Sequence, residues 1–276
     1  MKIAALPILL LLIAFAGCRA APAPDPGLLR VGVSVGPQAG LVRKIGGDRV
    51  AVTTMLPPGA SDEDVSLSPR QAVALEDVQL YVAVGHPAFP LEARYIRPFL
   101  ARHPEVRVVS LSGGDPHGDL HLWVSPQVMT AAARKVASEL AALDPAHAAE
   151  YQRNLAAFLE DAERLDREVR QRLSAPGVSR AFVVYHPSWT YFAERYGLEQ
   201  IAIEAEGKEP GAAGLILLID RARREGARVV LVPEGFPRES AQVIADAIHG
   251  RIVSADPLAP DWEGTLRRIS EVLSHG

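Results

Sequence analysis

The sequence predicts an α/β protein of two lobes, each a small parallel sheet flanked by helices, joined by one long backbone helix. Two stretches of the chain alternate short apolar strands with helices, which is typical of parallel sheets covered by helices. Between them lies one amphipathic segment, residues 144–174, long enough to form a rod of about 45 Å. A chain of 276 residues can give each lobe its own core.

The long segment has the pattern of a helix with one buried face. Its charged side carries Glu160/Arg164 and Glu163/Arg167, which are pairs of opposite sign four residues apart. A long surface helix or a coiled-coil partner would show the same pattern. We interpret it as a brace, because the sequences on its two sides look alike. The apolar residues recur at spacings of four and three: Tyr151, Leu155, Phe158, Ala162, Leu165 and Val169.

Residues 1–18 have the features of a signal peptide with a lipobox. Lys2 precedes an apolar stretch over 3–16, which is too short to span a membrane, and small residues stand just before Cys18. Cys18 is the only cysteine, so a disulfide within the chain is excluded. We expect a periplasmic or cell-surface lipoprotein anchored through a lipid on Cys18; an ordinary secretory leader is the alternative. Residues 19–27, rich in Pro and Ala, are predicted to be a tether.

The charge of the chain argues against nucleic acid as a partner. Its formal net charge is −4 and its pI is about 6.1. No run of basic residues is present, whereas nucleic-acid-binding proteins carry basic patches or stripes.

Residues 28–125 are predicted to form the first lobe. Prolines and a glycine at 57–59 exclude regular pairing there, so the following acidic run lies in a loop. Ligands of parallel sheets bind beyond the carboxyl ends of the strands, where Glu63 and His86 are placed. Asp62 and Asp64 are expected to be solvated. The predicted strands cover 29–35, 49–56, 78–84 and 106–111, and the predicted helices cover 36–47, 69–76 and 92–102.

Residues 126–176 are predicted to be linking helices, including the long one, and residues 177–276 to be the second lobe. His186 and Asp256 each follow a strand of this lobe, a placement like that of Glu63 and His121 in the first. Two groups from each lobe are therefore expected to meet in a cleft. The predicted strands cover 180–185, 198–203, 228–232 and 252–255, and the predicted helices cover 188–196, 212–225 and 237–249.

A short motif makes the expectation more specific. The segment His-Leu-Trp-Val-Ser-Pro at 121–126 is similar to the His-x-Trp-Leu-Asp-Pro motif of the cluster A-I solute-binding proteins, the zinc and manganese receptors of bacterial ABC importers. Further segments resemble that family in the same order along the chain. They are IGGDRV with LPPGA at 45–60, SLSP at 66–69, YH with YFA and YGL at 185–198, EP at 209–210 and SADPL at 254–258.

The resemblance implies a metal site made of Glu63, His121, His186 and Asp256. Zinc and manganese members generally have a histidine where this chain has Glu63. His186 matches the zinc members, whereas manganese members tend to have a glutamate there. Imidazole suits Zn²⁺ and carboxylate suits harder ions, so Zn²⁺ is expected in preference to Mn²⁺. His86 is the candidate for an additional metal ligand, with a surface histidine as the alternative.

The resemblance also implies a partner and a role. The protein would capture a divalent transition metal between its lobes and deliver it to the membrane permease of an ABC importer, acting as a monomer. The same family includes proteins associated with cell adhesion. The alternative is a divergent member that has lost tight metal binding and binds another ligand or has an accessory role.

A mixed histidine and carboxylate site would also suit a metallohydrolase, which keeps one position open for water. The chain contains no His-Glu-x-x-His motif, no Gly-x-Ser-x-Gly nucleophile elbow and no phosphate-binding glycine loop. We therefore expect that the protein is not an enzyme.

Overall fold

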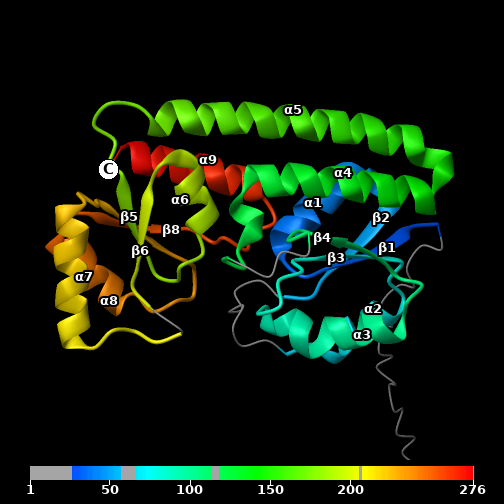
Figure 1. Ribbon diagram of the computed structural model, residues 1–276, viewed down its shortest axis with the longest axis horizontal. Helices are drawn as coiled ribbons and strands as arrows, with labels where there is room; N and C mark the ends of the chain where they lie inside the picture. Colours follow the sequence, from blue (N-terminus) through cyan, green and yellow to red (C-terminus); the bar gives the residue numbers. More distant parts are fainter. Residues whose placement is uncertain (1–26, 57–65, 114–117, 205–206, 276) are drawn as a thin grey trace, which may run out of the picture.

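The computed structural model describes residues 27–56, 66–113, 118–204 and 207–275. These ranges contain two four-stranded parallel sheets, in the orders β2-β1-β3-β4 and β6-β5-β7-β8. One long helix, α5 (Ala148–Leu173), runs above both sheets (Figure 1). The predicted fold class is therefore confirmed. The predicted leader, Cys18 and Glu63 lie outside the described residues. Within the described ranges, no helix combines the length and apolar character that a membrane span requires.

In the first sheet, β1 and β3 are the central strands and are buried on both faces. Val31 of β1 lies opposite Val52 and Leu80 in parallel register. Continuous apolar runs are typical of such doubly covered strands. Strand β2 lies at the edge and is half-buried along its length. The strands are β1 (Leu29–Val33), β2 (Val50–Thr54), β3 (Leu80–Ala83) and β4 (Arg107–Ser110).

Helices cover both faces of the first sheet. Helix α2 begins with a capping box, in which Ser68 Oγ accepts the Gln71 N–H at 3.3 Å and Gln71 Oε1 accepts the Ser68 N–H at 3.0 Å. The helix predicted at 69–76 is thus confirmed, whereas the one predicted at 92–102 begins with a π-helical turn. The helices are α1 (Gly36–Gly46), α2 (Pro69–Glu76), η2 (Glu92–Ile96) and α3 (Arg97–Arg102).

The second sheet repeats the plan of the first. Helix α6 ends at Gly197, whose left-handed backbone (φ 66°) suits a residue without a Cβ and turns the chain into the next strand. Helices α7 and α8 cover the outer side of the sheet (Figure 1). The elements are β5 (Ala181–Val184), α6 (Thr190–Tyr196), β6 (Glu199–Ala202), α7 (Ala212–Arg224), β7 (Val229–Val232), α8 (Glu239–Ala247) and β8 (Arg251–Ser254).

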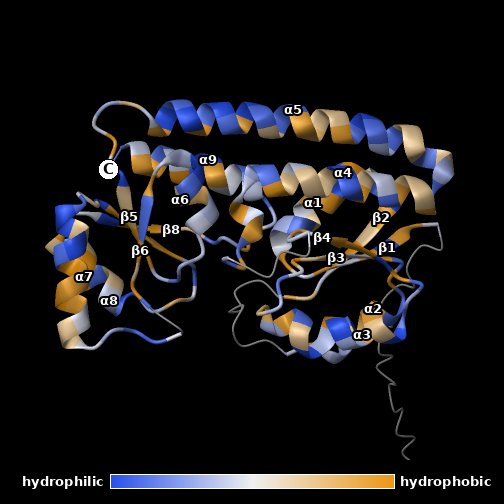
Figure 2. Ribbon diagram, viewed as in Figure 1, coloured by the Kyte–Doolittle hydropathy of each residue, from blue (hydrophilic) through white to orange (hydrophobic). Residues whose placement is uncertain are grey.

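The long helix belongs to a bracing layer of several helices. Helix α5 begins at Ala148 and not at Pro145 as predicted, because Pro145–His147 forms a separate 3-10 turn. The six apolar positions predicted to be buried are all buried. The charged pairs Glu160/Arg164 and Glu163/Arg167 lie on the outer face, where Figure 2 shows mostly hydrophilic residues. Beneath α5 lie α4 (Pro126–Leu143) and α9 (Trp262–Ser274) (Figure 1).

Helix α9 returns the chain from the second lobe toward the first. Trp262 packs against Phe158 of α5 with ring centroids 6.1 Å apart. Lys44 of α1 and Glu263 form an ion pair at 2.6 Å. One hydrophobic cluster extends from the first sheet through the bracing layer to the inner face of the second sheet. In the second sheet it includes Phe182 and Val184. A smaller cluster lies under α7 and α8.

Candidate functional site

The candidate site lies where the carboxyl ends of strands from the two lobes meet, as expected for parallel sheets. His86 follows β3 in the first lobe, and His186 follows β5 in the second. His121 stands before a short 3-10 turn, η3 (Leu122–Val124), in the connection from β4 to α4. All three histidines line one cavity of about 410 Å³, together with Ala88, Pro90, Gly118, Asp119, Leu120, Pro187 and Thr190.

The turn that carries His86 is fixed by two neighbours. Gly85 has φ 79°, and a Cβ at this position would lie 1.9 Å from Ser110 Oγ, so only glycine fits. The Glu92 carboxylate, 3% exposed, accepts the N–H groups of Val84 at 2.6 Å and Gly85 at 2.8 Å. Burial raises the pKa of Glu92 above its usual value, although these hydrogen bonds and that of Ser34 oppose the shift.

The rings of His121 and His186 meet although they belong to different lobes. Their centroids are 5.0 Å apart and their planes are inclined at 70°. The Trp123 ring also packs edge-on against His121, with ring centroids 5.2 Å apart. Both imidazole side chains are largely shielded from water, with exposed fractions of 5% for His121 and 15% for His186. The predicted convergence of these two histidines at the lobe interface is therefore seen in the structure.

Each of these two histidines has a carboxylate at its Nδ1 atom. Asp119 Oδ1 lies 2.5 Å from Nδ1 of His121, and Glu204 Oε1 contacts Nδ1 of His186. An ionised carboxylate only accepts hydrogen bonds, so it holds the proton on Nδ1 and leaves Nε2 as the nitrogen that could bind a metal. Burial alone would raise the pKa of Asp119, but the hydrogen bonds from His121 and Thr190 bring it below the usual value.

His86 has the opposite hydrogen-bond arrangement. His86 is buried, with 7% of the residue exposed, and its Nδ1 accepts the backbone N–H of Ala88 at 3.2 Å. A neutral imidazole that accepts at Nδ1 carries its proton on Nε2. Within the described part of the chain, this Nε2 is buried and has no hydrogen-bond partner. His86 therefore presents a donor, whereas His121 and His186 have the tautomer of metal ligands.

Asp256 follows β8 at the predicted place, but it is not among the residues that line the cavity. Its Oδ1 accepts the N–H of Leu258 at 2.8 Å. Burial, and secondarily the charge of Glu234, raise the pKa of Asp256. Across the ranges that the structure describes, no three His, Cys, Asp or Glu side chains converge closely enough to hold a metal ion. Glu63 falls outside those ranges.

Comparison with known proteins assigns the chain to a family. The family model described as "Zinc-uptake complex component A periplasmic" matches residues 31–275. The chain belongs to this zinc-uptake family. A periplasmic component of an uptake complex binds its substrate without transforming it, which confirms the expectation that the protein is not an enzyme.

Relatives within the zinc-uptake family support the assignment at the level of sequence and fold. The zinc uptake protein ZnuA of Paracoccus denitrificans is 28% identical over 94% of this chain and 91% of its own length. ZnuA of Brucella abortus is 33% identical over 52% of this chain and only 43% of its own length, so that match spans less than half of the relative. A crystal structure of a ZnuA protein superposes with a TM-score of 0.82, at 35% identity, over 90% of this chain and 99% of the other.

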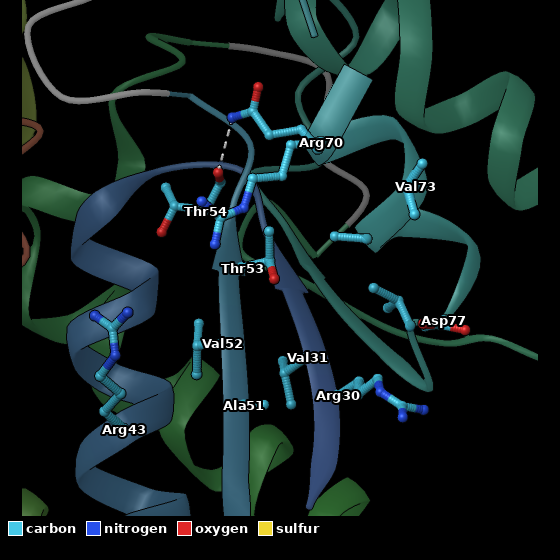
Figure 3. A pocket seen from close by; sticks show the side chains of 13 residues that line it. Arg30, Val31, Arg43, Ala51, Val52, Thr53, Thr54, Arg70, Val73 and Asp77 are labelled. Carbon is cyan, nitrogen blue, oxygen red and sulfur yellow. Dashed lines mark hydrogen bonds between the residues drawn. The ribbon is translucent and has the colours of Figure 1, made fainter. Parts of the chain in front are cut away.

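A larger cavity, of about 600 Å³, lies between α1, α2 and the edge strand β2 of this zinc-uptake family member (Figure 3). Its charged lining consists of Arg30, Arg43, Arg70 and Asp77. Three cationic groups against one carboxylate repel a divalent cation. The smaller, histidine-lined cavity is therefore the better candidate for a metal site, despite its size.

Three residues of the site were not found from the sequence. Asp119 and Glu204 hold the two histidines, and Thr190 contacts Asp119. Glu204 comes directly after the strand predicted at 198–203, so the rule that identified His186 and Asp256 could have identified it too. Asp119 stands two residues before His121, a spacing that by itself does not distinguish a partner from a solvated acid.

Proposed function

We propose that this protein captures a divalent transition metal, Zn²⁺ in preference to Mn²⁺, in the cleft between its two lobes and delivers it to the permease of an ABC importer. The pairing of His121 and His186 across the lobes carries the proposal. Two imidazoles bound to one tetrahedral zinc at about 2.05 Å place their ring centroids about 5 Å apart. The observed separation of 5.0 Å agrees with that value.

The carboxylates behind the two rings support the same assignment. Histidines that bind metals usually donate their other N–H to a carboxylate, a carbonyl or water, which fixes the ring and raises its basicity. Asp119 and Glu204 take this position for His121 and His186.

We infer that the remaining ligands are Glu63 and Asp256, the carboxylates that follow β2 and β8. Asp256 would exchange its hydrogen bond from Leu258 for the metal. His86 would need its proton moved from Nε2 to Nδ1 and would lose the hydrogen bond from Ala88 before it could bind. We therefore assign His86 the role of a hydrogen-bond donor to a ligand oxygen, and keep it as the replacement ligand if Glu63 does not bind.

The proposed donor set favours zinc without excluding manganese. Two imidazoles suit Zn²⁺, while two carboxylates also suit Mn²⁺, and at equal free concentrations the Irving–Williams order favours zinc. The two relatives described above carry the name of a zinc uptake system protein, in agreement with this order.

Competition titration of metal-free protein with Zn²⁺ and Mn²⁺ tests the proposal. The protein should bind one ion. Loss of a residue that only supports a metal ligand typically lowers affinity about 10–100-fold. His121→Ala and His186→Ala each remove a ligand itself and should therefore weaken binding by more than that. His275→Ala, an exposed histidine near the carboxyl end, is the matched control and should bind like the wild type. Wild-type affinity in either cleft variant would refute the cleft site.

The same titration addresses the second candidate, a divergent member without tight metal binding. Its motivation is Glu63, where the zinc and manganese members generally have a histidine. In that case the wild-type protein would bind neither ion, and its other ligand would have to be sought in the histidine-lined cavity.

We further propose that the mature protein is a monomer held at the periplasmic face of a membrane by a lipid on Cys18. The apolar leader ending in Ala16-Gly17-Cys18 supports this location. Mass spectrometry of the membrane fraction should find a lipidated cysteine as the first residue. An unmodified amino terminus beyond Cys18 would refute the anchor.

A further inference from the structure

The Asp119 carboxylate contacts both lobes at once. One oxygen, Oδ1, accepts the backbone N–H of His121 at 2.9 Å and lies 2.5 Å from its Nδ1. The other oxygen, Oδ2, accepts the hydroxyl of Thr190 at 2.5 Å. Asp119 and His121 belong to the first lobe, whereas Thr190 is the first residue of α6 in the second. A single side chain therefore joins the proposed metal ligand of one lobe to the Thr190 hydroxyl at the start of α6 in the other.

The direction of the hydrogen bond from Thr190 is fixed by its own surroundings. Gln200 of β6 donates its amide N–H to Thr190 Oγ1 at 2.5 Å, and Gln200 Oε1 accepts the N–H of Trp189 at 3.0 Å. The bond from Trp189 sets the orientation of the Gln200 amide. Because Thr190 Oγ1 receives the Gln200 proton, its own proton points to Asp119.

A second contact between the lobes lies beside the first. Tyr191 donates its phenol O–H to the backbone carbonyl of Asp119 at 2.9 Å. Gly118 has φ 100°, and a Cβ there would come within 3.0 Å of the Tyr191 hydroxyl, so the turn before Asp119 is shaped to admit this side chain. Asp119 is thus held through its side chain and its main chain by consecutive residues of α6.

We propose that Asp119 is a positioning residue that couples the orientation of His121 to the docking of the second lobe, so that release of the bound metal requires the Thr190–Asp119 hydrogen bond to open. The inference rests on the proposed function, because it takes His121 as a metal ligand. While the lobes are docked, both oxygens of Asp119 are engaged and the ring of His121 is held toward His186. When the lobes separate, Oδ2 loses its partner and the carboxylate is free to turn, which loosens the ring.

Valine in place of Thr190 separates the two roles of Asp119. Thr190→Val keeps the shape of the side chain but removes the donor to Oδ2, so that the carboxylate of Asp119 is held on the side of His121 alone. Thr190→Ser keeps the hydroxyl and is the matched control. Asp119→Asn disturbs both roles, because an amide can place a donor against Nδ1 of His121.

The first measurement is the rate of Zn²⁺ release into an excess of chelator, by stopped-flow spectrometry. A lost hydrogen bond to a carboxylate should accelerate release from Thr190→Val about tenfold. Thr190→Ser should release Zn²⁺ at the wild-type rate. Asp119→Asn should show faster release and an affinity lowered about 10–100-fold. Equal release rates for the valine and serine variants would overturn the proposal.

The second measurement needs no metal. Spin labels on cysteines introduced at the exposed positions Val73 of α2 and Val243 of α8, in a Cys18→Ser background, report the distance between the lobes. Thr190→Val should broaden this distance distribution and shift it to longer values, and Thr190→Ser should not. An unchanged distribution in Thr190→Val would also overturn the proposal. If the wild type bound no Zn²⁺, the proposed function would fail, but the spin-label distances would still decide whether Thr190 holds the lobes together.

Discussion

Trp123 donates its indole N–H to the carbonyl oxygen of Pro257 at 2.8 Å, although the two residues are 134 positions apart. Trp123 follows His121 by two residues, and Pro257 directly follows Asp256. This bond therefore ties the loop of one proposed ligand to the turn of another. It gives a physical reason for a tryptophan in this motif, where the sequence alone shows only a large side chain next to a histidine.

Removing the carboxylate behind His186 should weaken metal binding without unfolding the protein. Glu204→Gln keeps the volume of the side chain but no longer enforces a proton on Nδ1 of His186. The expected loss of Zn²⁺ affinity is about 10–100-fold, measured by competition titration. Glu199→Gln, on strand β6 and paired with Arg221 at the surface, is the control and should leave the affinity unchanged.

Metal binding should weaken in mild acid. A ligand imidazole must be neutral, and a free histidine has a pKa of about 6.5, so protons compete with the metal as the pH falls through this range. Titrations at about pH 7.5 and about pH 5.5 should therefore give a clearly lower affinity at the acid end. A constant affinity over this interval would argue against histidine ligands and in favour of carboxylates alone.

Alanine variants of Glu63 and His86 should differ in severity. If Glu63 is a ligand, Glu63→Ala weakens the binding of both ions, and Glu63→His raises the ratio of zinc to manganese affinity by adding a third imidazole. His86→Ala should then have the smaller effect, because it removes a donor and no ligand. The reverse order in competition titrations, with Glu63→Ala nearly silent and His86→Ala severe, would make His86 the ligand.

The brace should contribute to stability through Asp166. This residue of α5 accepts two hydrogen bonds from Arg195 of α6, both at 2.6 Å, and one from Tyr196 at 2.8 Å. Burial alone would raise the pKa of Asp166, but these partners lower it below its usual value. Asp166→Asn should reduce the free energy of unfolding by about 1–3 kcal/mol at neutral pH.

The pH dependence of that loss follows from the direction of the shift. A carboxyl group with a lowered pKa in the folded state contributes stability that is present above its unfolded pKa and lost as the pH falls through its folded pKa. The difference between Asp166→Asn and wild type should therefore shrink below about pH 4 in denaturant titrations. Asp161→Asn, an exposed position on the same helix, should stay close to wild type at every pH.

Local patterns were sufficient to predict most of the fold. The apolar runs of β1, β3, β5 and β7 identify buried strands, and the spacing of apolar residues on α5 identifies its inner face. The parallel direction of the strands follows from the alternation of strand and helix, whereas their order in each sheet is seen only in the structure. Element ends were less accurate: the helix expected from residue 188 begins at Thr190. The Ser188 hydroxyl bonds the His186 carbonyl, and the Trp189 N–H bonds Gln200 Oε1.

Contacts between distant residues could not be read from the sequence in the same way. His121 and His186 were identified because each stands near the end of a strand or in a family motif. The bond between Thr190 and Asp119 joins positions 71 apart and depends on how the lobes dock. The sequence analysis predicts no helix after Asp256, although the apolar residues there have helical spacing: Trp262, Leu266, Ile269 and Leu273. The packing of this helix, α9, on α5 and α1 likewise depends on how the whole chain folds.

The hydrophobic cluster that runs through the bracing layer has a consequence for how the chain acquires its structure. The first sheet and the inner face of the second share one interior, and α9, the last helix of the described chain, seals that interior against α1 and α5. The chain must therefore be synthesised through α9, which ends at Ser274, before either half can complete its interior. Expressed alone, residues 28–125 would expose the apolar surface that α5 and α9 cover, and would be prone to aggregate. The two lobes are separate in shape, but they form one cooperative unit in folding.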